Sequence, residues 1–319
     1  MRGFLYFAGS IPVDLMTPFS RSPLAPVWGA MGAILLSLGW LLPNHTQPWT
    51  SFHSDAWIAA SLAMIGLVVI VRARREVVWH GLILVVGLLI LLPFAQRVLG
   101  LLPFSGRAWI FSAYMIGLAL ALLVGQQWQR WRPIWMGDML FSAIGFAAAV
   151  SALIQLQQWL GMTATATLDV WVRASDGLRP SANMGQANQL ATLLLWGVLA
   201  CGWAVWRGAL GLAAALLASS FLLFGLALTQ SRTGALALLA IVLAAWFWRR
   251  QWGVRAVPWC VTGLAGLYAA TLLALPSLRR LLLLDVPGSM VTRLGHELRP
   301  DLWRLLLDAA WQRPWGGHG

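Results

Sequence analysis

Residues 209–229 read ALGLAAALLASSFLLFGLALT, a run of 21 residues without a charged side chain. A helix of about 20 apolar residues crosses the hydrocarbon core of a bilayer, so this run predicts a transmembrane helix. The stretch 94–107 is too short and too polar to cross, and we expect a loop there. The sequence therefore predicts an all-α, polytopic membrane bundle of about nine transmembrane helices. The other predicted spans are 24–43, 56–71, 77–93, 108–125, 134–159, 186–206, 233–248 and 256–275.

The composition agrees with a membrane protein and excludes a nucleic-acid-binding domain. Of 319 residues, 60% are hydrophobic and 10% are charged, and the mean hydropathy is +0.74. A soluble domain carries about 25% charged residues, far more than this chain has. The net charge is +12, and all 22 basic residues are arginines. Because these arginines are scattered between apolar segments, they do not form a basic face for DNA or RNA.

The distribution of the arginines predicts the orientation of the bundle. The turns after every second segment hold nine arginines, which are Arg72, Arg74, Arg75, Arg130, Arg132, Arg207, Arg249, Arg250 and Arg255. The alternate turns hold five, which are Arg97, Arg107, Arg173, Arg179 and Arg232. Since arginine-rich turns stay inside, we expect a cytoplasmic N-terminus and an outer location for everything after residue 276. The chain then divides into a transmembrane bundle over 1–276 and the start of a large outer loop over 277–319.

Three polar segments fall on the outer side of this topology, and the first begins at Arg179. Ser181 or Asn183 is placed to cap a helix that starts near residue 184. The N–H groups and the positive dipole end of that helix, beside the Arg179 charge, form a site for an anion such as phosphate. The alternative is an ordinary capped helix with an arginine at the membrane interface.

The second polar segment is TQSRTG at 229–234. The apolar run 233–248 that follows gives about 24 Å of helix, against a hydrocarbon core of about 30 Å. Arg232 is therefore expected at or slightly within the membrane edge. A charge there faces a bundle interior or a wet cavity, unless it snorkels outward. We expect a polar pocket next to Arg232, supported by Asn183, Gln186, Asn188 and Ser231.

The third polar segment is RPDLWRLLLDAAWQRPWGGHG at 299–319. Its residues from Pro300 to Gln312 predict a short helix with an apolar stripe, which we expect to lie in the outer membrane interface.

The remaining polar residues predict no metal or cofactor site. The histidines have no cysteines or carboxylates at ligand spacing, and no glycine-rich nucleotide loop is present. Asp138, near the cytoplasmic end of the fifth segment, is expected to pair with Arg132 or Arg130 rather than to carry protons.

With these motifs the chain resembles the O-antigen ligase and polymerase superfamily, and most closely the bacterial protein O-oligosaccharyltransferases that glycosylate pilins. The motif RPSANMGQANQLATLL at 179–194 is similar to the pattern of that subgroup, with Ala182 in place of its glycine and Ala187 in place of its proline. LTQSRTGAL at 228–236 is similar to the Ser-Arg-Thr signature of the superfamily, and 299–319 to its Arg-x-x-x-Trp, Pro and Gly-x-Gly pattern.

The resemblance implies a glycosyltransferase of the bacterial inner membrane. Such an enzyme moves an oligosaccharide from an undecaprenyl-diphosphate carrier to a serine or threonine of a protein acceptor at the periplasmic face. The diphosphate would be held by Arg179, Arg232 and Arg299, without a metal or other cofactor. The family's catalytic histidine is expected beyond Gly319, so the catalytic residue is unknown and the chain is expected to be truncated.

Several alternatives stay open at this stage. Within the superfamily, an O-antigen ligase or polymerase would use lipid A core or a glycan as the acceptor. An inactive fragment, or a non-enzymatic membrane transporter or scaffold, is a further alternative. A transporter predicts acidic side chains within spans or paired broken helices, and the sequence favours neither.

Overall fold

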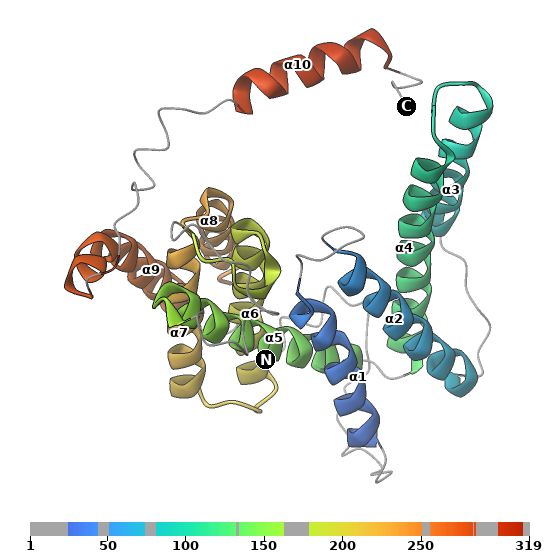
Figure 1. Cartoon of the computed structure of the whole chain (residues 1–319). Coiled ribbons are helices and arrows are strands. Elements are labelled where there is room, and N and C mark those ends of the chain that lie inside the picture. Colours follow the sequence, from blue (N-terminus) through green and yellow to red (C-terminus); the bar gives the residue numbers. More distant parts are fainter. Residues whose placement is uncertain are drawn as a thin grey trace. The chain divides into compact units, whose positions relative to one another are not determined.

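The computed structural model describes residues 25–43, 51–73, 81–131, 134–162, 179–250, 256–282, 284 and 299–314. Over these residues the regular secondary structure is entirely helical (Figure 1). The α-helices are α1 Ala25–Leu41, α2 Phe52–Ala73, α3 Gly81–Val98, α4 Ser105–Trp131, α5 Trp135–Trp159, α6 Ala187–Trp206, α7 Leu212–Thr229, α8 Arg232–Phe247, α9 Ala256–Leu281 and α10 Arg299–Gln312. One short 3₁₀ turn, η4 at Ala182–Met184, precedes α6.

The predicted all-α membrane bundle is confirmed. Seven of the described helices are long and apolar enough to cross a membrane, and α1 and α8 are shorter apolar helices. Each of the nine predicted spans overlaps one of these nine helices. Residues 1–24, and residues 285–298 and 315–319 of the predicted outer segment, lie outside the described residues.

Several boundaries differ from the prediction by a few residues, and two predicted helix ends were wrong because each was placed at a proline. Helix α3 continues past Pro93, and α4 already begins at Ser105, so most of the expected loop over 94–107 is helical. Helix α9 likewise continues past Pro276. A proline inside a helix removes one backbone hydrogen bond and costs about 3 kcal/mol in water. In transmembrane helices the freed carbonyl finds other partners, so the proline does not end the helix.

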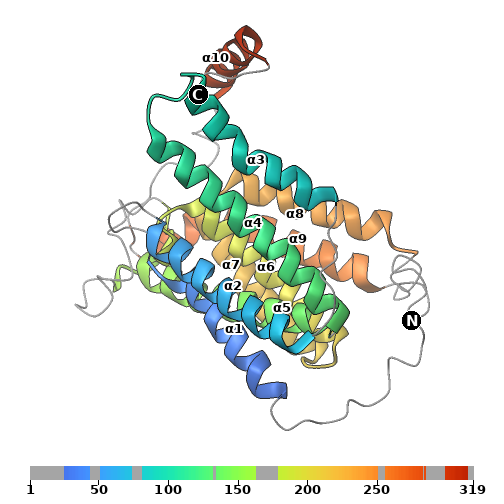
Figure 2. The ribbon, with the colours of Figure 1, turned by 90° about the vertical axis from the view of Figure 1, so that its right-hand side faces the viewer.

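The chain forms two compact units. The first unit comprises Met1–Trp57 and Gly137–Gly288, and the second comprises Ile58–Met136 and Ser289–Gly319. In the second unit α3 and α4 lie side by side as an antiparallel pair (Figure 2). The Ser112 hydroxyl donates to the carbonyl of Ile90 at 2.8 Å, which ties the two helices together.

Small residues bring the helices of the first unit close together. Gly197 of α6 faces both α5 and α7, and a Cβ atom there would lie 2.5 Å from Ala148 Cβ and 2.9 Å from Leu222 Cδ1. Membrane helices associate through such small residues, because lipid gives no hydrophobic drive between them. The buried core of this unit therefore lies where α5, α6 and α7 pack.

Replacing Gly197 with alanine is expected to lower the free energy of unfolding by about 1–3 kcal/mol, because the added methyl meets a backbone-fixed Cβ. The measurement is chemical denaturation in mixed micelles. Gly202→Ala on the same helix is the matched control, since a Cβ there meets nothing within 4 Å. Alanine is the better helix former, so the control should be equally or more stable. Equal stability of the two variants would contradict the close packing at Gly197.

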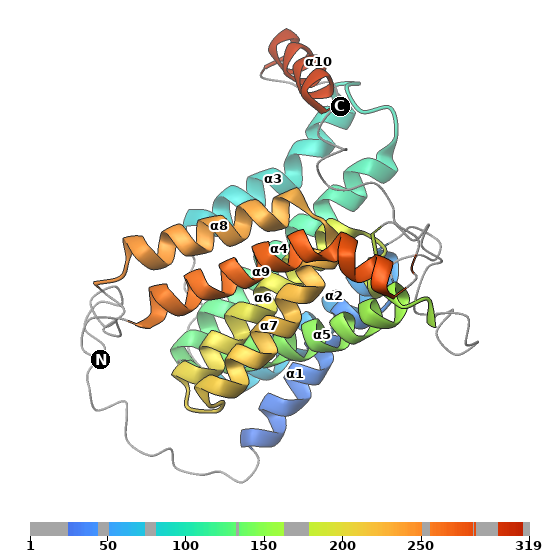
Figure 3. The same cartoon turned by 90° about the vertical axis from the view of Figure 1, so that its left-hand side faces the viewer.

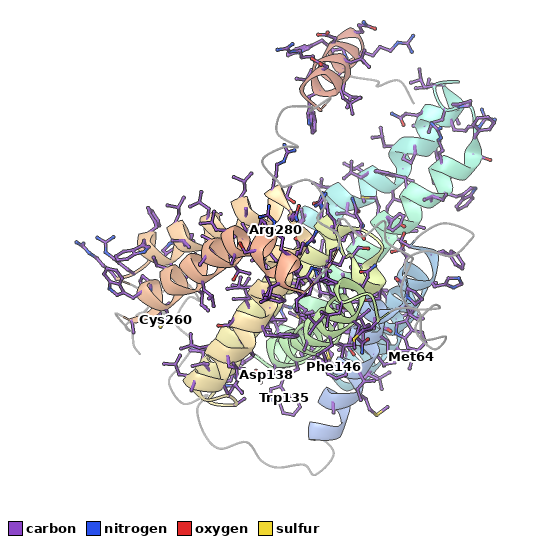
Figure 4. The ribbon with its side chains drawn as sticks, turned by 60° about the vertical axis from the view of Figure 1, so that its left-hand side comes forward. Met64, Trp135, Asp138, Phe146, Cys260 and Arg280 are labelled. Atoms are coloured by element: carbon purple, nitrogen blue, oxygen red, sulfur yellow. The ribbon has the colours of Figure 1, made fainter. Side chains whose placement is uncertain are left out.

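The first unit has two distinct ends. Helices α8 and α9 run antiparallel (Figure 3), with Trp246 Nε1 donating to Thr262 Oγ1 at 2.9 Å near the start of α9. Arg232, the first residue of α8, is therefore at the same end as the last turn of α9. Figure 4 labels Cys260 and Arg280 near opposite ends of α9.

Asp138 marks the other end of this unit. Its carboxylate accepts from Arg207 Nε at 2.7 Å and Nη2 at 2.9 Å, and from Trp203 Nε1 at 2.9 Å. The sequence predicted Arg132 or Arg130 as the partner of Asp138; the partner seen within this unit is Arg207, and Arg132 lies outside the described residues. Helix α6 runs antiparallel to α5, so its last turn returns Arg207 to Asp138. Within this unit Arg207 and Arg179 lie at opposite ends, as the alternation of turns predicts; the orientation of these ends in a membrane stays a prediction.

Candidate polar site at the ends of α6, α7 and α8

The turn before α6 differs from the predicted cap. Helix α6 begins at Ala187, and Gln186 at its N-cap is extended and makes no side-chain capping bond. Neither Ser181 nor Asn183 caps α6, and Ser181 makes no side-chain capping bond at η4. The reason is Gly185, whose φ of 66° turns the chain after η4 and delays the start of the helix.

Arg179 links the end of α7 to the start of α6. Its Nε donates to the carbonyl oxygen of Thr229 at 2.7 Å, and its Nη2 donates to Asn188 Oδ1 at 3.2 Å. Thr229 is the last residue of α7. A cation at the C-terminal end of a helix is electrostatically favourable, so α7 helps to hold the guanidinium in place.

Asn188 and Ser231 join the starts of α6 and α8. The Ser231 hydroxyl donates to Asn188 Oδ1 at 2.9 Å and accepts from the backbone N–H of Gly234 at 3.1 Å, which caps α8. The hydroxyls of Ser231 and Thr233 lie 2.9 Å apart. Because Ser231 has a single hydroxyl proton and gives it to Asn188, Thr233 is the donor of that pair.

Two helix N-termini therefore meet beside Arg179. The first turn of each helix presents backbone N–H groups that have no acceptor within the helix. It also carries the positive end of the helix dipole. Arg232 is the first residue of α8 and is half-buried. A cation next to the positive end of a helix dipole is unfavourable unless an anion lies nearby. The cluster of Arg179, Asn188, Ser231, Arg232 and Thr233, called the polar cluster below, can bind an oxyanion and contains no carboxylate.

The turn 180–184, which follows Arg179, is held in place by hydrogen bonds of buried amide side chains. Asn183 is 1% exposed, and its Nδ2 donates to the carbonyls of Trp40 at 2.7 Å and Leu41 at 3.2 Å, at the end of α1. The backbone N–H of Ala182 donates to Gln158 Oε1 at 2.9 Å. Asn183, predicted as part of the pocket, thus anchors the turn to α1.

The structure brings three of the predicted site residues into one hydrogen-bonded network, namely Arg179, Asn188 and Ser231, with Arg232 directly after Ser231. Gln186 is exposed at the start of α6. Arg299 is the first residue of α10 in the second unit, its side chain is outside the described part of the structure, and its role stays a prediction.

Four residues at this end were missed from the sequence. They are Thr229, which accepts from Arg179, Arg279, which is 3% exposed in the last turn of α9, and the buried glutamines Gln155 and Gln158. The glutamines had a visible signal, since two amides three residues apart inside an apolar span face a bundle interior. The position of Arg279 was hidden by the assumption that α9 ends at Pro276.

Within the described part of the chain, no three His, Cys, Asp or Glu side chains come together as a metal site would require. The polar cluster therefore offers positive charge, backbone and side-chain N–H groups and hydroxyls.

The comparisons with known proteins agree with the resemblance found in the sequence. Residues 214–319 match a family model described as O-antigen ligase, and residues 180–203 match one described as protein glycosylation ligase. A general O-oligosaccharyltransferase of Acinetobacter baylyi is 28% identical over 306 residues, which cover 90% of this chain and 51% of that protein. The chain thus spans about half the length of this curated relative. No solved structure matches it.

The resemblance to O-antigen ligases and protein O-oligosaccharyltransferases is therefore confirmed. The two family models together cover the turn before α6, most of α6 and of α7, and all of α8 to α10. The polar cluster lies where α6, α7 and α8 meet.

Proposed function

We propose that this chain contains the donor site of a membrane glycosyl ligase. In this proposal an oligosaccharide leaves an undecaprenyl-diphosphate carrier and is joined to a serine or threonine of a protein acceptor, at the periplasmic face of the bacterial inner membrane. The observation that carries the proposal is the network of Arg179, Asn188 and Ser231, which joins two helix N-termini at one end of the bundle. The bundle over 1–276 and the outer loop over 277–319 are part of the same proposal.

The polar cluster suits a diphosphate leaving group. In the reaction the bond between the anomeric carbon and the phosphate oxygen breaks, and the acceptor hydroxyl oxygen bonds to that carbon. Negative charge then develops on the departing diphosphate, and preorganised N–H donors and cations lower the barrier by stabilising it. Arg179 and Arg232 supply this charge in our proposal, together with Arg299. The hydroxyl proton passes to a base outside the polar cluster.

A protein acceptor is favoured by the segment that builds the turn before α6. Residues 180–203 match the protein glycosylation ligase model, and the curated relative is a general O-oligosaccharyltransferase. The second candidate is an O-antigen ligase or polymerase with a lipid A core or glycan acceptor, which the match of residues 214–319 favours. The donor chemistry at the polar cluster is the same in both.

The acceptor decides between these candidates. The full-length protein, in membranes supplied with a lipid-linked oligosaccharide, is offered a serine- and threonine-containing pilin-like protein or lipid A core in parallel. We expect a mass increase of one oligosaccharide on the protein, released by alkaline β-elimination. Transfer to lipid A core alone would establish the second candidate instead. Transfer to neither acceptor by a correctly inserted protein would overturn the proposal.

A further inference from the structure

Gln155 is a buried amide that the donor chemistry does not use. It lies in α5, one turn before the helix ends at Trp159, and it is 0% exposed. An amide within an apolar span is costly to bury unless its hydrogen-bonding groups find partners. Its contacts therefore indicate what it does.

The Gln155 amide holds two separate segments together. Its Nε2 donates to the carbonyl oxygen of Pro180 at 3.3 Å and to the carbonyl oxygen of Gly225 at 3.0 Å. Carbonyl oxygens only accept, so the nitrogen of the amide must face them, and each of its two N–H groups serves one carbonyl. Gln155 thus ties the turn before α6 to the side of α7.

Gly225 makes this approach possible. A Cβ atom at this position would lie 2.7 Å from Gln155 Oε1 and 3.2 Å from Leu194 Cδ1. Any larger residue on α7 would push the amide away from the carbonyls that it binds. The absence of a side chain at Gly225 is therefore required for the two hydrogen bonds that Gln155 donates.

The amide acts on the part of the turn that carries Arg179. Pro180 directly follows Arg179, and Gly225 is one helical turn before Thr229, whose carbonyl accepts from Arg179. Two neighbouring residues of the turn are thus bound to two successive turns of α7, one directly and one through Gln155. These two connections fix the position of the Arg179 guanidinium along the axis of α7, beside Asn188.

We propose that Gln155 is a positioning residue, which through Pro180 and Gly225 sets Arg179 for the donor diphosphate. This inference rests on the proposed function of the polar cluster. Gln155→Met keeps the length and nearly the volume of the side chain but removes both donors. The loss of two buried hydrogen bonds predicts a rise of about tenfold or more in the KM for the lipid-linked oligosaccharide. The KM for the protein acceptor should not change.

The experiment uses the full-length protein in proteoliposomes, with donor and acceptor concentrations varied separately. Gln157→Met is the matched control, because Gln157 is exposed on the same helix. Gly225→Ala disturbs the amide from the α7 side and should give the same rise in donor KM. Its control is Gly263→Ala, where a Cβ meets nothing within 4 Å. A loss of folded protein alone would lower the apparent kcat and leave both KM values unchanged, and that result in both variants would overturn the inference.

A double-mutant cycle separates this inference from the proposed function. Arg179→Lys keeps the charge but loses the forked geometry, so it should raise the donor KM by itself. If Gln155 acts through Arg179, adding Gln155→Met to Arg179→Lys should raise the donor KM by less than twofold further. Fully multiplicative effects would mean that Gln155 does not act through Arg179. An unchanged donor KM in Arg179→Lys and Arg179→Ala would instead overturn the proposed donor site.

Discussion

Replacing Arg232 with alanine is expected to reduce transfer from the lipid-linked oligosaccharide by about 10²- to 10³-fold, while the protein folds and inserts normally. Arg232 is the first residue of α8 and follows Ser231, which is hydrogen-bonded to Asn188. Arg232 therefore belongs to the polar cluster by its position in the chain, and in our proposal its charge stabilises the departing diphosphate. The measurement is the initial rate of glycan transfer with purified full-length protein at saturating acceptor.

The same substitution is expected to change the free energy of unfolding by less than about 1 kcal/mol. A positive charge in the first turn opposes the helix dipole by about 0.3–1 kcal/mol, and its removal offsets the loss of the contacts that the Arg232 side chain makes. Arg249→Ala is the matched control, since Arg249 is exposed just after the other end of α8, with its Cζ 6.0 Å from the Trp246 ring centroid. We expect the control to transfer within about twofold of the unchanged protein. Normal transfer by a folded Arg232→Ala protein would remove Arg232 from the donor site.

The positive charge of Arg232 is unfavourable at the positive end of the dipole of its own helix. Residues that are locally unfavourable in this way are common at functional sites. Residues chosen for stability alone would place an acidic or neutral side chain at the first position of α8. The conflict at Arg232 is offset when a diphosphate binds, because the anion favours both the arginine and the helix N-termini. Nearly unchanged stability together with a loss of activity is therefore the result that distinguishes a binding residue from a structural one.

The helices were predictable because composition decides them. An uncharged apolar run such as 209–229 is stable only in a lipid bilayer or a buried core. The observed helix α7 begins within three residues of the predicted start. The errors came from Pro93 and Pro276, where a rule for helices in water was applied to helices in a membrane. Alternation of turns then placed Arg179 and Arg232 at one end without any knowledge of contacts.

The contacts of the site could not be read from the sequence. Whether Asn183 caps α6 or binds the end of α1 depends on where α1 lies, and 142 residues separate Asn183 from Leu41. The partners of Gln155 depend on a close approach that the absent side chain of Gly225 permits. Such hydrogen bonds join segments that are distant along the chain, so no local pattern encodes them.

Replacing Asn188 with aspartate is expected to reduce transfer by about 100-fold through charge alone. The two side chains have the same shape, and Asn188 Oδ1 already accepts from Arg179 Nη2 at 3.2 Å and from the Ser231 hydroxyl at 2.9 Å. A carboxylate keeps both hydrogen bonds and pairs with Arg179. It also repels a bound diphosphate, and a unit charge about 6 Å away at an effective dielectric constant of about 20 costs nearly 3 kcal/mol. The loss should appear mainly as a higher KM for the lipid-linked oligosaccharide.

Two further variants assign the cause of this loss. Asn188→Ala removes the hydrogen bonds without adding charge and should reduce transfer by only about tenfold. Gln189→Glu adds the same charge to the same turn of α6 at an exposed position, and should change transfer by less than about threefold. Because an acidic residue favours the first turn of a helix, Asn188→Asp should be at least as stable as the unchanged protein. If Asn188→Asp and Asn188→Ala lose the same activity, the repulsion is absent, and no diphosphate binds within reach of Asn188.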